Sequence, residues 1–171
     1  MILYKNNLPL LPQEEIAGHL GLVVPPEETK SFFKPQTLTK PPKYGWGTRA
    51  FMKEWSFNKF FAKARIPLEF EYLPADEISS ANELIERLRS AEQDDRDVLV
   101  NYNWEHINTG KPGLQRHVIL FDRVTDKGPR FVDTSIWNEK WPVISAEKLF
   151  EAIQRHNGVI GGIWYFNKKQ P

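Results

Sequence analysis

Two short apolar runs stand on either side of a polar turn, at residues 117–124 (HVILFDRV) and 130–135 (RFVDTS). Apolar runs that are joined by a short turn containing Asp and Gly are typical of a β-hairpin. The sequence therefore predicts two adjacent antiparallel strands, and any fold of this chain has to contain them.

The order of the other elements narrows the fold class. A capping box, Ser80 with Glu83, predicts a helix at 79–91, and Ser145 is expected to begin another. A mostly antiparallel sheet that follows helices and ends with a late helix indicates an α+β fold and not an alternating βαβ one. The other predicted elements are helices at 12–20, 51–64 and 146–156, strands at 68–73, 98–104 and 158–166, and a proline-containing loop at 22–48.

Composition limits the function classes. A chain of 171 residues predicts one domain, and its formal net charge of +1 argues against an electrostatic nucleic-acid binder. The segment MILYKNNLPLL is too short and interrupted for a signal peptide or a membrane span, so a cytoplasmic location is expected. The absence of cysteine excludes disulfides, thiolate metal sites and a cysteine nucleophile within these residues.

His117 stands at the head of the first hairpin strand and Asp133 near the end of the second. If the hairpin pairs about the turn at 125–129, these positions face each other closely enough for the carboxylate to accept a hydrogen bond from the imidazole. Such a carboxylate fixes the tautomer of a histidine base and leaves the other ring nitrogen free to take a proton. The alternative is an ordinary half-exposed histidine at a strand end.

Other histidines allow a second interpretation of this region. His106, His117 and Asp133 could together bind a metal ion, although no HxH or HExxH spacing is present, so no metal site is predicted. His19 and His156 have structural explanations, because a histidine near a helix C-terminus interacts favourably with the helix dipole.

The segment YGWGT at residues 44–48 is either a tight turn with an aromatic plug or part of a substrate groove. It is not a phosphate-binding loop, because no lysine followed by serine or threonine comes after the glycines, and no cofactor is expected. The groove interpretation names Gly45, Trp46 and Gly47, together with Trp104 from the many tryptophans of the chain.

Several segments resemble papain-like proteins in their order along almost the whole chain. They are QEEIAGHLGLVVP, GWGT, FNKFF followed by IPL, DVLVNYNW, HVILFDRV, FVDTS and GGIWYF. They are most similar to the bacteriocin-processing (double-glycine) peptidase branch and its bacterial relatives. The resemblance implies a single papain-like domain over residues 1–171, with helices packed on the sheet, His117 as general base and Asp133 as its orienting group. Relatives often have Asp-Pro where this chain has Asp133 and Thr134.

The family nucleophile is a cysteine in a helix that reads roughly Cys-x-x-Met-Ile-Leu, so Met1 matches the methionine inside that helix. We therefore expect the cysteine and an oxyanion glutamine to precede residue 1, and the 171-residue form to be inactive and less stable, or self-associating. A peptide or protein is the expected partner, with no nucleic acid and no membrane. The alternatives are a non-catalytic peptide-binding pseudoenzyme and, less favoured, a metal-dependent hydrolase.

Overall fold

The structure is a computed structural model that describes residues 1–31, 35–40, 42, 46–113, 115–135, 138–156 and 160–169. The chain forms two compact units, Met1–Glu69 and Phe70–Gln170, which are described here one after the other. The expectation of one domain over residues 1–171 stays a prediction. Within the described residues, no helix is both long and apolar enough to cross a membrane.

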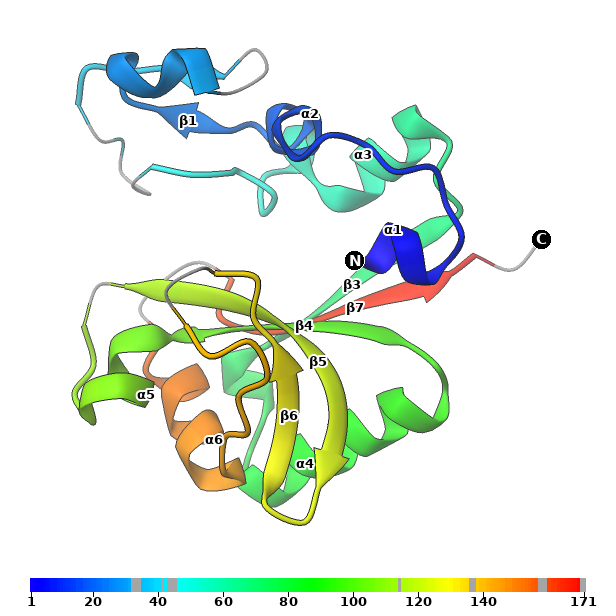
Figure 1. The fold of residues 1–171 in the computed structure, drawn as a ribbon, viewed down its shortest axis with the longest axis vertical. Helices are drawn as coiled ribbons and strands as arrows, with labels where there is room; N and C mark the ends of the chain where they lie inside the picture. The colour runs from blue at the N-terminus through cyan, green and yellow to red at the C-terminus, as the bar shows by residue number, and fades with distance from the viewer. Residues whose placement is uncertain are drawn as a thin grey trace. The chain divides into compact units, whose positions relative to one another are not determined.

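The first unit consists of short elements (Figure 1). Strands β1 and β2 pair in parallel, with Val23 opposite Gln36, so the loop predicted at 22–48 contains a small two-stranded sheet. Gly47 pairs with Val23 from the other side through two backbone hydrogen bonds of 2.9 and 3.0 Å. The elements are α1 (Ile2–Lys5), α2 (Gln13–His19), β1 (Val23–Val24), β2 (Gln36–Thr37), α3 (Phe57–Ala64) and 3₁₀ helices at Pro26–Ser31 and Lys53–Trp55.

The helix predicted at 51–64 is wrong in its first part, because α3 begins only at Phe57. Ser56 has an extended backbone, and its hydroxyl accepts a hydrogen bond from the amide of Lys59 at 3.4 Å. Ser56 is therefore the N-cap, which is the position serine prefers over a helix interior. Of the apolar residues before it that suggested helical spacing, Trp55 belongs to a separate 3₁₀ helix and Phe51 lies in the turn that precedes that helix.

The second unit is a five-stranded sheet in the order β3-β7-β4-β5-β6, in which the β4–β7, β4–β5 and β5–β6 pairs are antiparallel. Helices and a mostly antiparallel sheet confirm the predicted α+β class. The elements are β3 (Leu68–Pro74), a 3₁₀ turn (Ala75–Glu77), α4 (Ala81–Gln93), β4 (Asp97–Asn103), α5 (Trp104–Thr109), β5 (Arg116–Thr125), β6 (Gly128–Val132), α6 (Ala146–Gln154) and β7 (Gly162–Lys168).

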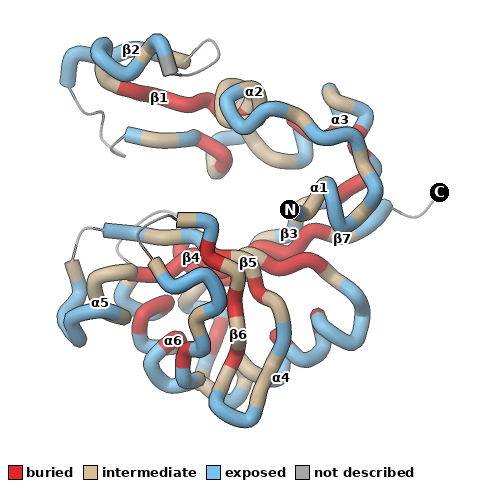
Figure 2. The backbone as a smooth tube through the Cα atoms, viewed as in Figure 1, coloured by how far each residue is buried: buried red, intermediate tan, exposed pale blue. Residues whose placement is uncertain are grey.

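The core of this unit lies between the sheet and helices α4 and α6. Leu84 and Leu88 of α4, together with Leu149 and Ile153 of α6, are completely buried against strand residues such as Val100. Figure 2 shows the buried stretches of the tube concentrated in the strands and on the inner sides of these helices. Burial of each such side chain contributes about 1.5–3 kcal/mol, so this cluster holds the sheet and its helices in one arrangement.

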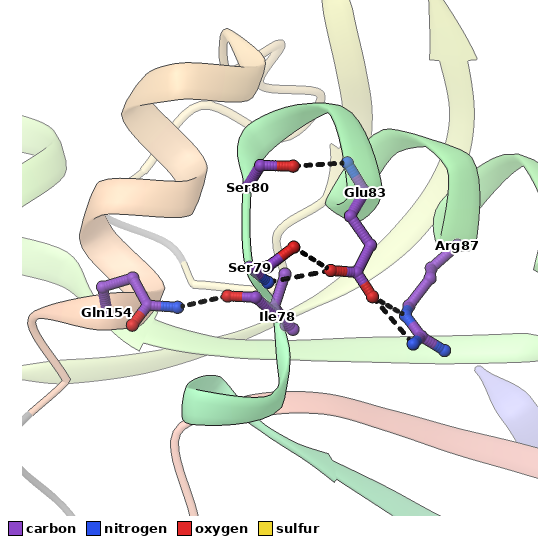
Figure 3. Close-up of polar contacts among 6 residues, drawn as sticks. All are labelled: Ile78, Ser79, Ser80, Glu83, Arg87 and Gln154. Carbon is purple, nitrogen blue, oxygen red and sulfur yellow. Dashed lines mark hydrogen bonds and ion pairs between the residues drawn. The ribbon is translucent and has the colours of Figure 1, made fainter.

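The predicted N-cap of α4 at Ser80 is confirmed, while Glu83 bonds to Ser79 and not to the Ser80 amide of a standard capping box (Figure 3). The Ser80 hydroxyl accepts a hydrogen bond from the Glu83 amide at 3.2 Å, which satisfies one of the free N–H groups of the first turn. The Glu83 carboxylate reaches back to Ser79, accepting from its amide at 2.8 Å and its hydroxyl at 2.6 Å. Gln154 of α6 donates to the Ile78 carbonyl at 3.0 Å, so the two helices are joined at the start of α4.

Helix α5 was not predicted, because the strand at 98–104 was expected to include Trp104. The strand ends at Asn103, whose side-chain oxygen accepts from the His106 amide at 2.9 Å and caps the new helix. Gly110 then ends the helix with a φ of 73°, a conformation that glycine adopts at little cost. The short helix turns the chain at the end of the sheet where the next strand begins with Arg116 and His117.

Candidate functional site

A β-bulge in the hairpin decides which face Asp133 occupies. From the turn, Thr125 pairs with Gly128 and Arg123 with Arg130, but beyond Asp122 the register changes and Phe121 pairs with Phe131. Residues that face each other across a ladder point to the same side, and every second residue does so along a strand. The one-residue shift therefore places Asp133, two residues after Phe131, on the same face as Phe121 and His117.

The structure brings the two predicted residues together. His117 Nε2 lies 2.7 Å from Asp133 Oδ2, and since an ionised carboxylate only accepts, Nε2 carries the proton. The Asp133 side chain is 3% exposed and that of His117 is 24% exposed, so the carboxylate is inside and the imidazole reaches the surface. Nδ1 makes no hydrogen bond with any residue that the structure describes, so it is the nitrogen available to take a proton.

Asp133 accepts hydrogen bonds from other residues in addition to His117. Its Oδ1 accepts from the Ser135 amide at 2.8 Å, and its Oδ2 also accepts from the Asn138 side-chain amide at 2.9 Å. Burial acts to raise the pKa of Asp133, but the hydrogen bonds from Ser135, Asn138 and His117 outweigh it and lower the pKa. The carboxylate is thus ionised and fixed in orientation, as a residue that positions an imidazole has to be.

Tyr102 supports the imidazole from the neighbouring strand. It pairs with His117 in the β4–β5 register, and the two rings meet edge to face with centroids 6.0 Å apart. Tyr102 is only 3% exposed, and its burial, with a contribution from the Asp133 charge, raises the pKa of its hydroxyl. Tyr102 therefore stays a neutral hydroxyl beside the pair, and it limits the motion of the His117 ring.

Two cavities adjoin the His117–Asp133 pair. The first, of about 310 Å³, is lined by His117 together with Trp104, Ser135 and Asn138 among others. The second, of about 540 Å³, lies on the Asp133 side, beside α5 and the start of α6. Trp104 and Asn138 line both cavities, so the pair stands between two hollows of the size that small ligands and side chains occupy.

The residues of the predicted groove are distributed between the two units. Trp104 lies in the second unit and lines both cavities. Trp46 and Gly47 lie in the first unit, where Trp46 is 39% exposed and Gly47 pairs with β1. Gly45 lies outside the described residues. A groove that combines all four residues stays a prediction.

His106 does not join His117. It is buried on α5, and its Nε2 lies 3.1 Å from the Glu151 carboxylate of α6. Among the described residues, no three His, Asp or Glu side chains are grouped so that they could hold a metal ion. The arrangement therefore does not support the metal-site interpretation of His106, His117 and Asp133.

The other two histidines, His19 and His156, make contacts that are explained by the packing of the fold. His19 is the last residue of α2, and its ring stacks on Phe60 with centroids 5.4 Å apart. His156 follows α6, and its Nε2 lies 3.1 Å from the side-chain oxygen of Asn101. Both lie near a helix C-terminus, as expected, and neither lines the cavities beside His117.

Two participants in the site were not predicted. Asn138 belongs to the loop after β6, and nothing in its sequence surroundings distinguishes it from other loop amides. Tyr102 was placed on a strand, and only the β4–β5 register, which pairs it with His117, would have identified it. No model of a known protein family matches the chain, and no curated protein matches it either.

Proposed function

We propose that this protein is related to papain-like thiol peptidases, with His117 as the general base and Asp133 as the residue that orients it. The observation that carries the proposal is the hydrogen bond from His117 Nε2 to a buried, ionised Asp133, which leaves Nδ1 free beside a cavity. A histidine held in this way at one nitrogen is arranged to accept a proton at the other. The family resemblance supports the same two roles.

In the proposed chemistry, Nδ1 of His117 takes the proton of a cysteine thiol, and the resulting thiolate attacks a peptide, amide or thioester carbonyl. The imidazolium then gives its proton to the leaving group, and water releases the acyl group from sulfur. Asp133 favours the imidazolium, because its negative charge lies at hydrogen-bond distance from the ring.

The 171 residues contain no cysteine, so we propose that by themselves they do not hydrolyse peptides. Where a longer gene product supplies a cysteine ahead of Met1, it would complete the site. The test is thiol-dependent hydrolysis of a fluorogenic peptide library by such a longer chain. His117→Ala is expected to lower turnover by at least about a hundredfold, the usual contribution of a general base.

The control for this test is His19→Ala, which removes an imidazole of the first unit that lines neither cavity beside His117. It is expected to leave turnover unchanged. Equal turnover in the His117→Ala variant and the unmodified chain would reject the proposed role of His117, whatever the source of the nucleophile.

A second candidate function is a non-catalytic peptide-binding module. It is favoured by two observations: no residue of the chain is a cysteine, and two cavities nevertheless adjoin the histidine. This function predicts that the 171-residue form binds peptides and that His117→Ala weakens the binding. If the longer chain shows no thiol-dependent turnover while the shorter one binds, the binding module is the better description.

A further inference from the structure

Residues 140–144 extend the sheet beyond its last strand. They run antiparallel beside β6, which ends the strand order of the second unit (Figure 1). Three backbone hydrogen bonds of 2.9 to 3.1 Å join Lys140, Pro142 and Ile144 to β6 and to the residue directly after it. Consecutive residues of an antiparallel strand direct their backbone groups to alternate sides, so Trp141 and Val143 direct theirs away from β6.

The outer edge of this segment carries unpaired backbone groups. Neither Trp141 nor Val143 makes a backbone hydrogen bond with another residue in the described part of the chain. Pro142 removes no donor from this edge, because its nitrogen lies on the side of β6. The edge therefore offers two donors and two acceptors in the alternation that another strand requires.

Two apolar side chains are exposed along the same edge. Trp141 is 53% exposed and Val143 43%, and alternation places both on the face of the sheet that bears Arg130. The Arg130 guanidinium lies over the Trp141 ring, 5.6 Å from its centroid, and its Nε donates to the Asp122 carboxylate at 2.6 Å. The tryptophan is thus held in place before a partner arrives, which reduces the entropy lost on association.

A second copy of this chain fits the edge, because the edge is complementary to itself. Two copies related by a two-fold axis beside Pro142 place Trp141 of each opposite Val143 of the other. Each of these two pairs exchanges two hydrogen bonds, so all the unpaired groups of both edges are used. The exposed tryptophan and valine then form cross-strand pairs on one face, and such pairs stabilise sheets.

The charges at the ends of the edge favour the same arrangement. In this register Glu139 of one copy lies opposite Ser145 of the other, where α6 begins. Lys148 stands in the first turn of α6, and neither it nor Glu139 forms an ion pair with another residue that the structure describes. The carboxylate of each copy therefore approaches the lysine of the other, and this happens twice in the dimer.

We propose that the outer edge of residues 140–144 is a homodimer interface, in which the segments of two copies pair as antiparallel strands and join their sheets. The interface is small, so the dimer is expected to be weak, with a dissociation constant of roughly 10–100 µM. The proposal is independent of the function proposed above, because it uses neither His117 nor a nucleophile.

Sedimentation equilibrium of the 171-residue chain, at concentrations on both sides of the expected dissociation constant, measures the association. The mass is expected to rise from 20.0 kDa toward twice that value. Along the same series, NMR should show the Trp141 and Val143 amides becoming protected from hydrogen exchange. The Asp133 amide, which is bonded to Lys140 within one copy, should be protected throughout. A monomer at every concentration, or a dimer in which the Trp141 and Val143 amides stay unprotected, overturns the proposal.

Reversal of charge tests the register. Glu139→Lys brings two lysines together and Lys148→Glu two carboxylates, so each change is expected to weaken the dimer roughly 3- to 10-fold. The double variant restores opposite charges and should recover most of the affinity. Glu86→Lys makes the same charge change at an exposed position of α4 and is the control, which should leave association unchanged. Equal association in all four variants, or no recovery in the double variant, overturns the proposed pairing.

Discussion

Asp133 shows how a single carboxylate connects stability with the site. Its pKa is lowered in the folded protein because three hydrogen bonds favour the ionised form more than burial opposes it. A group with a lowered folded-state pKa stabilises the protein above its unfolded-state pKa, which is about 3.9 for aspartate. That stabilisation is complete above the unfolded-state value and is lost progressively as the pH falls through the folded-state value.

We therefore predict that Asp133→Asn lowers the free energy of unfolding by about 2 kcal/mol at pH 7, the scale of hydrogen bonds to a charged group. The difference from the unmodified protein should shrink as the pH falls below 4, because the unfolded chain then binds a proton at Asp133 that the folded protein takes up only at lower pH. Urea unfolding between pH 2.5 and 7 measures this. Asp126→Asn, at an exposed turn position, is the control and should show no difference at any pH. A deficit that is the same at pH 2.5 and 7 would contradict the explanation.

The sequence predicted part of this site for physical reasons. His117 and Asp133 were predictable as candidates because one lies near the start of a strand and the other next to the end of the following strand, but the face that they share depends on the register shift near Asp122, which alternation does not give. Asn138 was not, because its position depends on the path of an irregular loop. Tyr102 was recognisable as a strand residue, but its contact with His117 depends on a register that alternation alone does not determine.

At the scale of elements, the β5–β6 hairpin determines whether the pair can form. Gly128 follows the turn with a φ of 125°, and a Cβ at this position would collide with the backbone carbonyl oxygen of Ile144. Both the backbone conformation and the space thus require glycine. The residues of the turn and the two strands favoured a hairpin. The bulge at Asp122 could not be predicted, because it depends on how Phe121 and Phe131 pack in the core.

We predict that Gly128→Ala destabilises the protein by about 3 kcal/mol, since it combines a strained φ with a steric conflict against backbone. Gly110→Ala is a matched control. That glycine also has a positive φ, of 73°, but open space surrounds the position of a Cβ. It should cost about 1 kcal/mol, from conformational strain alone. Equal losses in chemical denaturation would show that the contact with Ile144 is unimportant.

Helix α4 supplies a second prediction at this scale. Hydrogen bonds from the Ser79 hydroxyl and amide, followed by Arg87, lower the pKa of Glu83 to about 2. Glu83 therefore stabilises the start of α4 above its unfolded-state pKa, about 4.3, and this stabilisation is lost as the pH falls toward 2. Glu83→Gln should remove that pH dependence from urea unfolding curves, whereas Glu86→Gln, at an exposed site on the same helix, should preserve it. An unchanged pH dependence in Glu83→Gln would contradict the role of the capping box.

The helix caps show which features of an element can be predicted from the sequence and which cannot. The Ser80 and Ser145 caps were predictable because the groups that satisfy them lie within four residues. Helix α5 was missed although Asn103 caps it, because the apolar strand before it and the following tryptophan suggested a longer strand. Short elements of this kind are determined by their packing and by the residues that end them, more than by periodicity.

At the scale of the whole molecule, the order of the elements predicted the α+β class. It did not predict how the buried residues are distributed between the two units. In the second unit, two helices bury leucines completely against the sheet. In the first unit, α1 and α2 contain no buried residue, and the two strands have two residues each. Composition could not predict this difference, because the aromatic residues that favour a core are spread over both parts of the sequence.

We predict that the two units differ in local stability, with amide hydrogens of β4 and β5 exchanging only on global unfolding and those of β1 at a lower opening free energy. Leu84→Ala should lower the exchange free energies of β4 and β5 by about 3 kcal/mol, because it leaves a cavity in the larger core. Leu10→Ala, at a side chain that is 67% exposed, is the control and should change neither. Hydrogen exchange read out by mass spectrometry distinguishes the possibilities, and uniform protection of β1 and β4 would show instead that the chain unfolds as one cooperative body.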